Sequence, residues 1–330
     1  MRAFTFRRYG GVDELRLEEI SRPEPKPDEV LVRVKAVSLN DWDYELLHGR
    51  PFVNRLSYGM SKPKISILGS DIAGVVEAVG EDVVDLEIGD AVFGDLSFEK
   101  FGGFADYVCA PEKCLHKKPE GMSFEEAAAI PQAGMLCFQA LFDAASINMN
   151  KRILINGAGG GVGTFALQIL QPFNPDITVV DREEKLDRLI ELGANCAFDY
   201  RNVDFTRTGE TYDIIIDVQT RRSAGDYARA LEKQGVYVSL GGDIGKVFKC
   251  LFWSPFIFLF AGKHLKVVML KPNRDLAFFA DQYQQDLIKP VIDSVFAFDD
   301  LPRAMEKFGA SLQVGKIVVT MSGKEESQSA

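Results

Sequence analysis

Apolar and polar positions alternate over short stretches in the first 120 residues, which predicts a domain of many short β-strands. Residues 30–37, VLVRVKAV, show the alternation expected of a strand with one buried face. The prolines at 23, 25 and 27 form a connector that cannot lie inside a helix. A barrel-like or sandwich-like arrangement is therefore expected. The other strands predicted here cover residues 1–6, 15–20, 67–79, 89–94 and 104–108.

The pattern changes near Ser123, where Ser123 and Glu126 have the spacing of a capping box at a helix start. Apolar runs of strand length then alternate with amphipathic helical stretches, and this alternation predicts a parallel sheet with helices on both faces. We expect helices at 125–130, 134–146, 162–171, 183–192, 223–233 and 274–285, and strands at 153–156, 177–180, 196–198, 213–217, 235–240, 266–270 and 317–320. The last of these strands is expected to return to the N-terminal β domain.

A glycine-rich turn, GAGGGVG at 157–163, joins the strand at 153–156 to the helix that follows. Backbone N–H groups at a helix N-terminus suit a phosphate, and residues without side chains let a pyrophosphate approach. A tight turn without a ligand is the alternative explanation of such a stretch. The residues predicted to bind the cofactor here are Gly157, Ala158, Gly160, Gly161, Val162 and Gly163, of which Gly163 would let the helix pack closely on the strand.

Asp181 ends the next strand, about 20 residues beyond the glycines, where dinucleotide-binding folds place the group that reads the adenosine ribose. Turns after later strands should flank the nicotinamide, because ligands of such sheets bind beyond the carboxyl ends of the strands. These turns contain Val218, Leu240, Gly241 and Gly242, although plain connecting turns would look the same. The combination of turn, strand and acidic residue predicts a dinucleotide site.

Composition narrows the class of protein. The formal net charge of −10 argues against nucleic acid or an anionic membrane as the main partner. A chain of 330 residues favours two domains. Five cysteines without C-x-x-C spacing are read as reduced thiols of a cytoplasmic protein. The N-terminus lacks the apolar region of a signal peptide, and residues 323–330 are polar and expected to be frayed.

A dense apolar run, CLFWSPFIFLFA, covers residues 250–261 and is interrupted by Ser254 and Pro255. The run is shorter than the roughly 20 residues that a bilayer-spanning helix needs, so no integral membrane segment is expected. Three interpretations stay open: a buried helix pair or subunit-interface patch, an apolar wall over the substrate site, or a loop that dips into one lipid monolayer.

Several motifs together make the chain resemble the medium-chain dehydrogenase/reductase superfamily, close to its zinc-free quinone oxidoreductases and enone reductases. The resemblance covers nearly the whole chain and rests on GSDIAGVV at 69–76, GDAVF at 89–93, GFADY at 103–107, PQAG at 131–134, the glycine-rich turn, ELGA at 191–194 and GKIVV at 315–319. It implies an α/β chain with a GroES-like catalytic domain over residues 1–122, completed by 271–330. A Rossmann nucleotide-binding domain of doubly wound parallel-sheet type would cover 123–270.

The zinc ligands of metal-dependent relatives are missing at the matching positions. Those relatives have a cysteine where this chain has Asn40 and Asp41, and Gly-His-Glu where it has Gly69, Ser70 and Asp71. Their four-cysteine lobe is absent, and the three histidines lack metal-ligand spacing. The resemblance therefore implies chemistry without a metal, which suits an electron-poor quinone or conjugated C=C better than an alcohol.

The choice between NADPH and NADH divides the candidate residues. Asp181 favours NADH, since a carboxylate accepts from a ribose hydroxyl and repels a 2′-phosphate. Arg182, Lys185 and Tyr200 favour NADPH, because Lys185 and Tyr200 match the positions that hold the 2′-phosphate in NADPH-using relatives. A solvated lysine and a half-buried surface ring are the alternatives for these two residues. NADPH is the favoured cofactor, and NADH stays possible.

For catalysis, Asn40 matches the asparagine that relatives place beside the nicotinamide, where its amide would donate to an enolate-like oxygen. An ordinary helix N-cap would explain Asn40 equally well. Tyr44 is named as a candidate proton donor, with Tyr58 and solvent as alternatives. Relatives often have a threonine near the nicotinamide where this chain has Leu136.

The activity expected from these residues is NADPH-dependent, metal-free transfer of hydride to a small hydrophobic quinone or α,β-unsaturated carbonyl. The two other hypotheses are a non-catalytic dinucleotide-binding sensor or partner protein, and a zinc-independent alcohol dehydrogenase. A homodimer is expected from the frequency of two-fold symmetry among oligomers.

Overall fold

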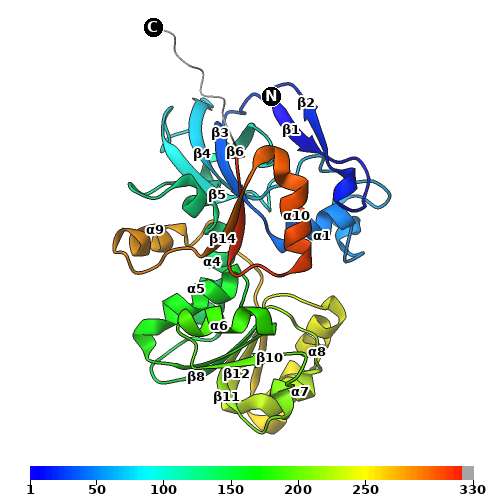
Figure 1. Ribbon diagram of the computed structural model, residues 1–330, viewed down its shortest axis with the longest axis vertical. Helices are drawn as coiled ribbons and strands as arrows, with labels where there is room; N and C mark the ends of the chain where they lie inside the picture. The colour runs from blue at the N-terminus through cyan, green and yellow to red at the C-terminus, as the bar shows by residue number, and fades with distance from the viewer. Residues whose placement is uncertain (322–330) are drawn as a thin grey trace.

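The computed structural model describes residues 1–321, and the stretch 323–330 that was expected to be frayed lies outside them. Two sheets organise the chain, one in an upper domain that contains the N-terminus and one in a lower domain (Figure 1). Helices α1 and α10 flank the upper sheet, whereas α5, α6, α7 and α8 surround the lower one (Figure 1).

The upper domain is built from antiparallel strands, apart from one parallel pair. A hairpin-like pair, β1 (Arg2–Thr5) and β2 (Arg16–Glu19), lies beside a seven-stranded sheet of order β14-β15-β3-β4-β5-β7, and β6 also pairs with β3. The strands of this sheet are β3 (Glu29–Ser38), β4 (Asp71–Val79), β5 (Ala91–Asp95), β6 (Tyr107–Pro111), β7 (His116–Lys117), β14 (Ile292–Ala297) and β15 (Lys316–Thr320). Because β15 pairs with β3, the last strand returns to the N-terminal domain as predicted. The limits of the two domains stay predictions.

The lower domain contains a six-stranded, fully parallel sheet of order β10-β9-β8-β11-β12-β13. Its strands are β8 (Arg152–Asn156), β9 (Asp176–Asp181), β10 (Cys196–Asp199), β11 (Tyr212–Asp217), β12 (Leu231–Ser239) and β13 (His264–Val267). In chain order this is 3-2-1-4-5-6, the order of dinucleotide-binding folds, with the change of direction beside β8. The predicted α/β class, a β-rich domain combined with a doubly wound parallel sheet, is confirmed.

Ten α-helices are found among the described residues. They are α1 (Asp41–His48), α2 (Asn54–Tyr58), α3 (Phe124–Ala128), α4 (Pro131–Phe138), α5 (Gly161–Leu170), α6 (Glu183–Glu191), α7 (Ala224–Ala230), α8 (Ile244–Ala261), α9 (Leu276–Gln284) and α10 (Leu301–Ala310). The largest core cluster joins α3, α4 and α5 to β8 and β9, and it reaches Ala36 and Val318 of the upper sheet. Shared apolar packing thus connects the two domains at the level of α4.

Several predicted boundaries were wrong: for example, the strands expected at 67–79 and 266–270 are β4 and β13, and three further differences have a direct physical cause. The helix expected at 134–146 begins at Pro131, because proline at the first helical position loses no hydrogen bond, and it continues as a π-helical turn, Gln139–Ala144. The helix expected at 223–233 ends at Ala230, since Leu231 already pairs with Tyr212 in the sheet. The strand expected at 104–108 is β6, Tyr107–Pro111, where the chain pairs with β3.

The apolar run at 250–261 also differs from its prediction. It is part of one continuous helix, α8, and Pro255 lies inside it. Proline removes one backbone hydrogen bond. Ahead of it the helix is held by Cys250 in the core and by Ser254, whose hydroxyl donates to the Leu265 carbonyl at 2.7 Å, and beyond it by Ile257, which packs against the same core cluster. Among the described residues, α8 alone is long and apolar enough to cross a membrane by length and composition. Cys250 is its only buried residue, so the predicted buried helix pair is wrong.

Candidate active site

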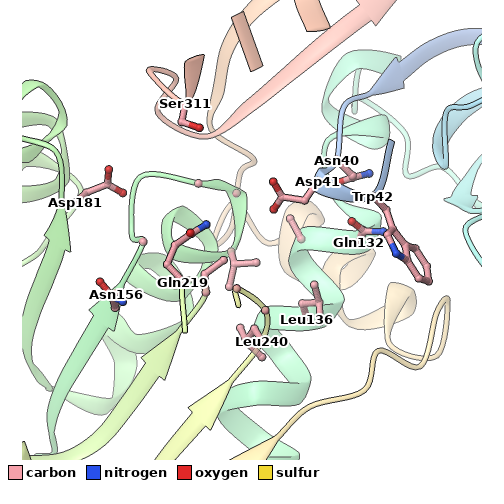
Figure 2. Close-up of a pocket in the computed structure, with 18 of the residues that line it drawn as sticks. Asn40, Asp41, Trp42, Gln132, Leu136, Asn156, Asp181, Gln219, Leu240 and Ser311 are labelled. Carbon is pink, nitrogen blue, oxygen red and sulfur yellow. The ribbon is translucent and has the colours of Figure 1, made fainter. Parts of the chain in front are cut away.

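A cleft of about 1110 Å³ separates the two domains and receives the carboxyl ends of the parallel strands. On the lower side it is lined by the glycine-rich turn, the end of β9 and the turns after β11 and β12. On the upper side it is lined by the first turns of α1 and by residues 311–316 before and within β15. Figure 2 shows the two groups facing each other, with Asp181 and Asn156 at one end and Asn40, Asp41 and Trp42 at the other.

The glycine-rich turn is shaped for close approach from the cleft. Gly157 has φ 82°, a left-handed conformation that favours glycine, and Gly160 is the N-cap of α5. A Cβ on Gly163 would lie 2.1 Å from the Ala158 carbonyl oxygen, so Gly163 and Ala158 form the close contact between α5 and the turn that follows β8. The predicted residues Gly157, Gly160, Gly161 and Val162 line the cleft, whereas Ala158 and Gly163 support them from below.

Asp181 lies against the glycine-rich turn and is buried. Its carboxylate accepts from the backbone N–H of Gly159 at 2.7 Å and from that of Arg182 at 2.8 Å. The Lys185 ammonium lies 3.4 Å away, and both side chains are at most 10% exposed. Lys185 is therefore a buried ion-pair partner of Asp181 rather than a solvated lysine, and Asp181 holds the turn in place.

Three arginines and a tyrosine line the end of the cleft near Asp181. Arg182, at the start of α6, and Tyr200, after β10, both line it. Arg221 and Arg222 follow β11 and line it too, although the sequence analysis did not single them out. Arg222 is held by Asp204 at 2.8 Å, whereas Arg221 is exposed and donates to the Gln219 side chain at 3.1 Å. Local positive charge therefore gathers here despite the acidic composition of the chain.

A buried hydrogen-bond network fixes the turns beneath the middle of the cleft. The Asp217 carboxylate accepts from the Asn156 side chain at 2.7 Å, the Gln219 backbone at 2.8 Å and the Tyr237 hydroxyl at 2.9 Å. This network ties together the ends of β8, β11 and β12. The predicted residues above it, Val218, Leu240, Gly241 and Gly242, all line the cleft.

Asn40 begins α1 and lines the opposite side of the cleft. Its backbone N–H donates to Asp43 at 3.0 Å, and its side-chain amide donates to the Ser70 hydroxyl at 3.1 Å. Its side-chain oxygen accepts from the Lys316 ammonium. The amide nitrogen carries two hydrogens, and the bond to Ser70 uses one of them. Asn40 is thus both the N-cap of α1 and a cleft residue, so a capping role and a catalytic role are compatible.

Tyr44 lies on the outer side of α1, away from the cleft. Its ring contacts His48 and Phe308, and a Cβ on Gly309 would lie 2.5 Å from its hydroxyl. The described residues that line the cleft do not include Tyr44. Tyr44 therefore packs between α1 and α10. Because it does not face the cleft, it is not placed to donate a proton there.

The cleft face of α1 presents two carboxyl groups instead. They belong to Asp41 and Glu45, which lie one helical turn apart. Surrounding protein raises the pKa of Glu45 to about 7, the charge of Asp41 adds to this rise, and the Asn54 amide at 3.4 Å opposes it. Trp42 and Phe98 form an aromatic wall beside them, with ring centroids 5.2 Å apart.

The position that holds zinc in metal-dependent relatives contains a lysine network. The buried Lys316 ammonium donates to the Leu39 carbonyl at 3.0 Å and lies 3.6 Å from the Asp71 carboxylate. Asp71 also accepts from the Gln132 backbone N–H at 3.2 Å. No group of three histidine, cysteine, aspartate or glutamate side chains suited to a metal ion occurs within residues 1–321. A hydroxyl, an amide and an ammonium group do not fit a zinc site.

Family models match two parts of the chain. A model described as "Alcohol dehydrogenase GroES-like domain" matches residues 26–120, and one described as "Zinc-binding dehydrogenase" matches residues 192–319. These stretches belong to the upper domain and to the lower domain with its return to the upper sheet.

Curated proteins match nearly the whole of this chain. Quinone-oxidoreductase QR1, chloroplastic, of Triphysaria versicolor is 30% identical over 333 residues, covering 97% of this chain and 98% of that protein. The 2-methylene-furan-3-one reductase of Solanum lycopersicum is 29% identical over 330 residues, covering 97% of this chain and 79% of that protein.

Among solved structures, the quinone oxidoreductase from Coxiella burnetii matches with a TM-score of 0.85 and 26% identity, covering 97% of this chain and 99% of that one. Sequence and structure thus agree along nearly the whole chain. The chain belongs to the medium-chain dehydrogenase/reductase superfamily, in the group that contains the quinone oxidoreductases and the enone reductases.

Proposed function

We propose that this chain is an NADPH-dependent reductase that delivers hydride to a hydrophobic quinone or α,β-unsaturated carbonyl without a metal ion. Family membership makes it an NAD(P)H-dependent oxidoreductase. The observation that carries the finer proposal is the cleft itself, which joins a basic end, a glycine cradle and an apolar end.

The cleft residues fit a nicotinamide dinucleotide. A Cβ built on Gly160 meets no atom closer than 3.9 Å, so the glycine leaves open space at the N-terminus of α5. The first-turn N–H groups there have no helical acceptors and favour a phosphate. Gly160 and Gly161 would hold the pyrophosphate, and Val218, Leu240 and Gly241 would lie along the nicotinamide half.

When bound, the reduced nicotinamide supplies a hydride to an electron-poor carbon. The residues of this chain would position the acceptor against it: Trp42, Phe98 and Leu136 contribute apolar walls that exclude water. The second amide hydrogen of Asn40 would donate to the oxygen on which negative charge develops. The acceptor class resembles the substrate printed in the name of the tomato relative, a ketone conjugated to a methylene group.

The cations around the adenosine end favour NADPH. Lys185 is engaged by Asp181, so we assign the 2′-phosphate to Arg182 and Arg221, with Tyr200 beside them. Replacing both arginines with alanine should raise KM for NADPH about 10- to 100-fold, since a hydrogen bond to a charged group is worth about 1.5–3 kcal/mol. KM for NADH should change little. Steady-state kinetics with both cofactors measure this.

Arg188→Ala is the matched control for that experiment, because Arg188 is exposed on the same helix and pairs only with Glu191 among the described residues. Its cofactor kinetics should equal those of the unaltered enzyme. If the double variant loses affinity for NADH and NADPH equally, the two arginines do not read the 2′-phosphate.

Glu45 is our candidate for the proton donor. A carboxyl group with a pKa of about 7 is protonated below that pH and loses its proton above it. The rate of product protonation, and with it kcat/KM, should therefore fall about tenfold per pH unit above 7. Glu45→Gln should lower kcat about 100-fold and abolish this fall, as loss of a general acid does.

Glu306→Gln, an exposed substitution on α10, is the control and should keep both the rate and the pH profile. A profile of Glu45→Gln that still falls above pH 7 would assign protonation to solvent or to another group.

The proposal is tested by oxidation of NADPH in the presence of a naphthoquinone and of a medium-chain enone. Tight cofactor binding without acceptor-dependent oxidation would favour a sensor or partner protein, and reduction of the oxidised cofactor by alcohols would favour an alcohol dehydrogenase. A cytoplasmic location and a homodimer also stay proposals, and the relative from Triphysaria versicolor is named as chloroplastic.

A further inference from the structure

Helix α8 exposes more large apolar side chains than a surface helix of a soluble enzyme normally does. The exposed fractions are 62% for Phe248, 66% for Phe252, 47% for Phe256, 73% for Leu259 and 82% for Phe260. Trp253, Leu251 and Phe258 are also exposed, at 49%, 44% and 53%. An 18-residue helix of this kind needs a covering partner.

Among residues 1–321, α8 is held to the rest of the molecule mainly along one face. Cys250 and Ile257 pack on the cluster formed by α7, β12 and β13, and Ser254 donates to the carbonyl oxygen of Leu265. These positions are four and three residues apart, so they form one stripe along the helix. In Figure 1 the helix lies at the outer margin of the lower domain, beside α7.

The opposite face is a continuous apolar stripe made by Phe248, Phe252, Phe256 and Leu259, at intervals of four, four and three residues. Trp253 and Phe260 flank it. Aromatic side chains with one polar atom, as in tryptophan, suit the boundary between lipid chains and water. The helix stays anchored through its inner stripe, so it would lie along a membrane rather than cross it.

The charges of α8 are of one sign. Residues 244–261 contain Lys246 and Lys249 but no aspartate or glutamate, in a chain whose formal net charge is −10. Asp243, directly before the helix, accepts from the backbone N–H of Lys246 as its N-cap. On the neighbouring α7, Asp226 is engaged by Arg229. The net charge of −10 argues against an anionic membrane for the chain as a whole, but this basic, aromatic helix is locally complementary to an anionic lipid surface.

We propose that α8 docks this enzyme on the surface of an anionic lipid bilayer, with its outward stripe among the acyl chains and Lys246 and Lys249 among the headgroups. A second copy of the chain is the competing occupant. Two apposed α8 helices would bring four lysines and no acidic residues from these helices into the same interface, whereas anionic headgroups would neutralise them.

The position of α8 gives this docking a consequence for the substrate. Gly242 and Asp243 line the cleft, and α8 begins at the next residue. Met269, at the carboxyl end of the neighbouring sheet edge, lines the cleft and is 76% exposed. A docked α8 would hold the cleft near the lipid surface, where apolar quinones and enones dissolve. This consequence rests on the proposed function, but the docking does not.

Vesicle flotation tests the docking. The full chain should float with vesicles of phosphatidylcholine and phosphatidylglycerol and much less with phosphatidylcholine alone. Phe252→Ser combined with Leu259→Ser should reduce the partition coefficient at least about tenfold. Val84→Ser combined with Ile88→Ser is the matched control, since these side chains are 84% and 66% exposed in the upper domain.

The fluorescence emission of Trp253 reports membrane contact without any substitution in α8. The chain has two tryptophans, so in the Trp42→Phe variant its emission should shift to shorter wavelength when anionic vesicles are added. Lys246→Gln with Lys249→Gln should weaken binding to anionic vesicles only, and Lys62→Gln with Lys64→Gln should not.

The outcomes separate docking from the proposed reaction. Absence of flotation and of an emission shift in the unaltered α8 overturns the proposal, whatever the activity with soluble quinones. A lipid-free oligomer that dissociates in the Phe252→Ser, Leu259→Ser variant overturns it in favour of a second copy. Equal flotation of the Phe252→Ser, Leu259→Ser variant and the Val84→Ser, Ile88→Ser control also overturns the proposal, because the membrane contact would then belong to another surface.

Discussion

Replacing Lys316 with methionine is expected to destabilise the protein by about 3–5 kcal/mol and to abolish most of its activity. The Lys316 ammonium is the buried partner of Asp71, with side chains 5% and 0% exposed. It also donates to Asn40 and Leu39, so its loss leaves the buried Asp71 carboxylate without its counter-ion and two buried oxygens without this donor. Urea unfolding and steady-state kinetics measure the two effects.

The same ion pair offers an internal test. Adding Asp71→Asn to Lys316→Met removes the uncompensated charge, so the double variant should recover part of the lost stability. Lys307→Met is the exposed control: its side chain is 37% exposed, and loss of its ion pair with Asp293 should cost under about 1 kcal/mol. Equal losses for Lys316→Met and Lys307→Met would contradict the buried network described above.

The second large effect is expected at Gly160. Valine at this position fits the fold, because an added Cβ meets no atom within 3.9 Å and the backbone φ is −86°. The side chain would fill the space in which the pyrophosphate approaches α5. We expect NADPH to bind at least about 100-fold more weakly, since the phosphate loses its contacts with the helix N-terminus. Titration of NADPH fluorescence measures the dissociation constant.

Two other glycines show whether that loss is specific. Gly225→Val, in α7 outside the cleft, also meets open space and should leave both folding and NADPH binding unchanged. Gly163→Val should fail to fold normally, because its Cβ would lie 2.1 Å from the Ala158 carbonyl oxygen. Normal NADPH affinity in folded Gly160→Val would place the pyrophosphate elsewhere.

The sequence predicted the features that depend on local pattern. The glycine-rich turn follows from the backbone geometry that a tight strand–helix connection needs, and the sheet follows from the alternation of apolar runs with helices. The turn after β11, with Val218, was found because all parallel strands end on one side. The order of the strands then brings Arg221 and Arg222 to the adenosine end, which no local pattern indicates.

Features that depend on packing between distant segments were missed. Lys185 has the spacing of a cofactor ligand, but its orientation is set by Asp181, itself held by Gly159. Whether Tyr44 or Glu45 faces the cleft depends on which side of α1 contacts α10. The apolar run in α8 left burial, a subunit interface, a substrate-site wall and a membrane contact open, since composition cannot reveal that no segment among residues 1–321 covers the helix.

Acceptor-dependent oxidation of NADPH tests the central proposal most directly. Purified protein is treated with a metal chelator and mixed with NADPH or NADH, and absorbance is followed after a naphthoquinone or a medium-chain enone is added. We predict oxidation that needs the acceptor, survives the chelator and has a kcat/KM at least about tenfold higher with NADPH than with NADH. Cofactor that binds but is not oxidised with either acceptor, or activity that the chelator removes, would contradict the account.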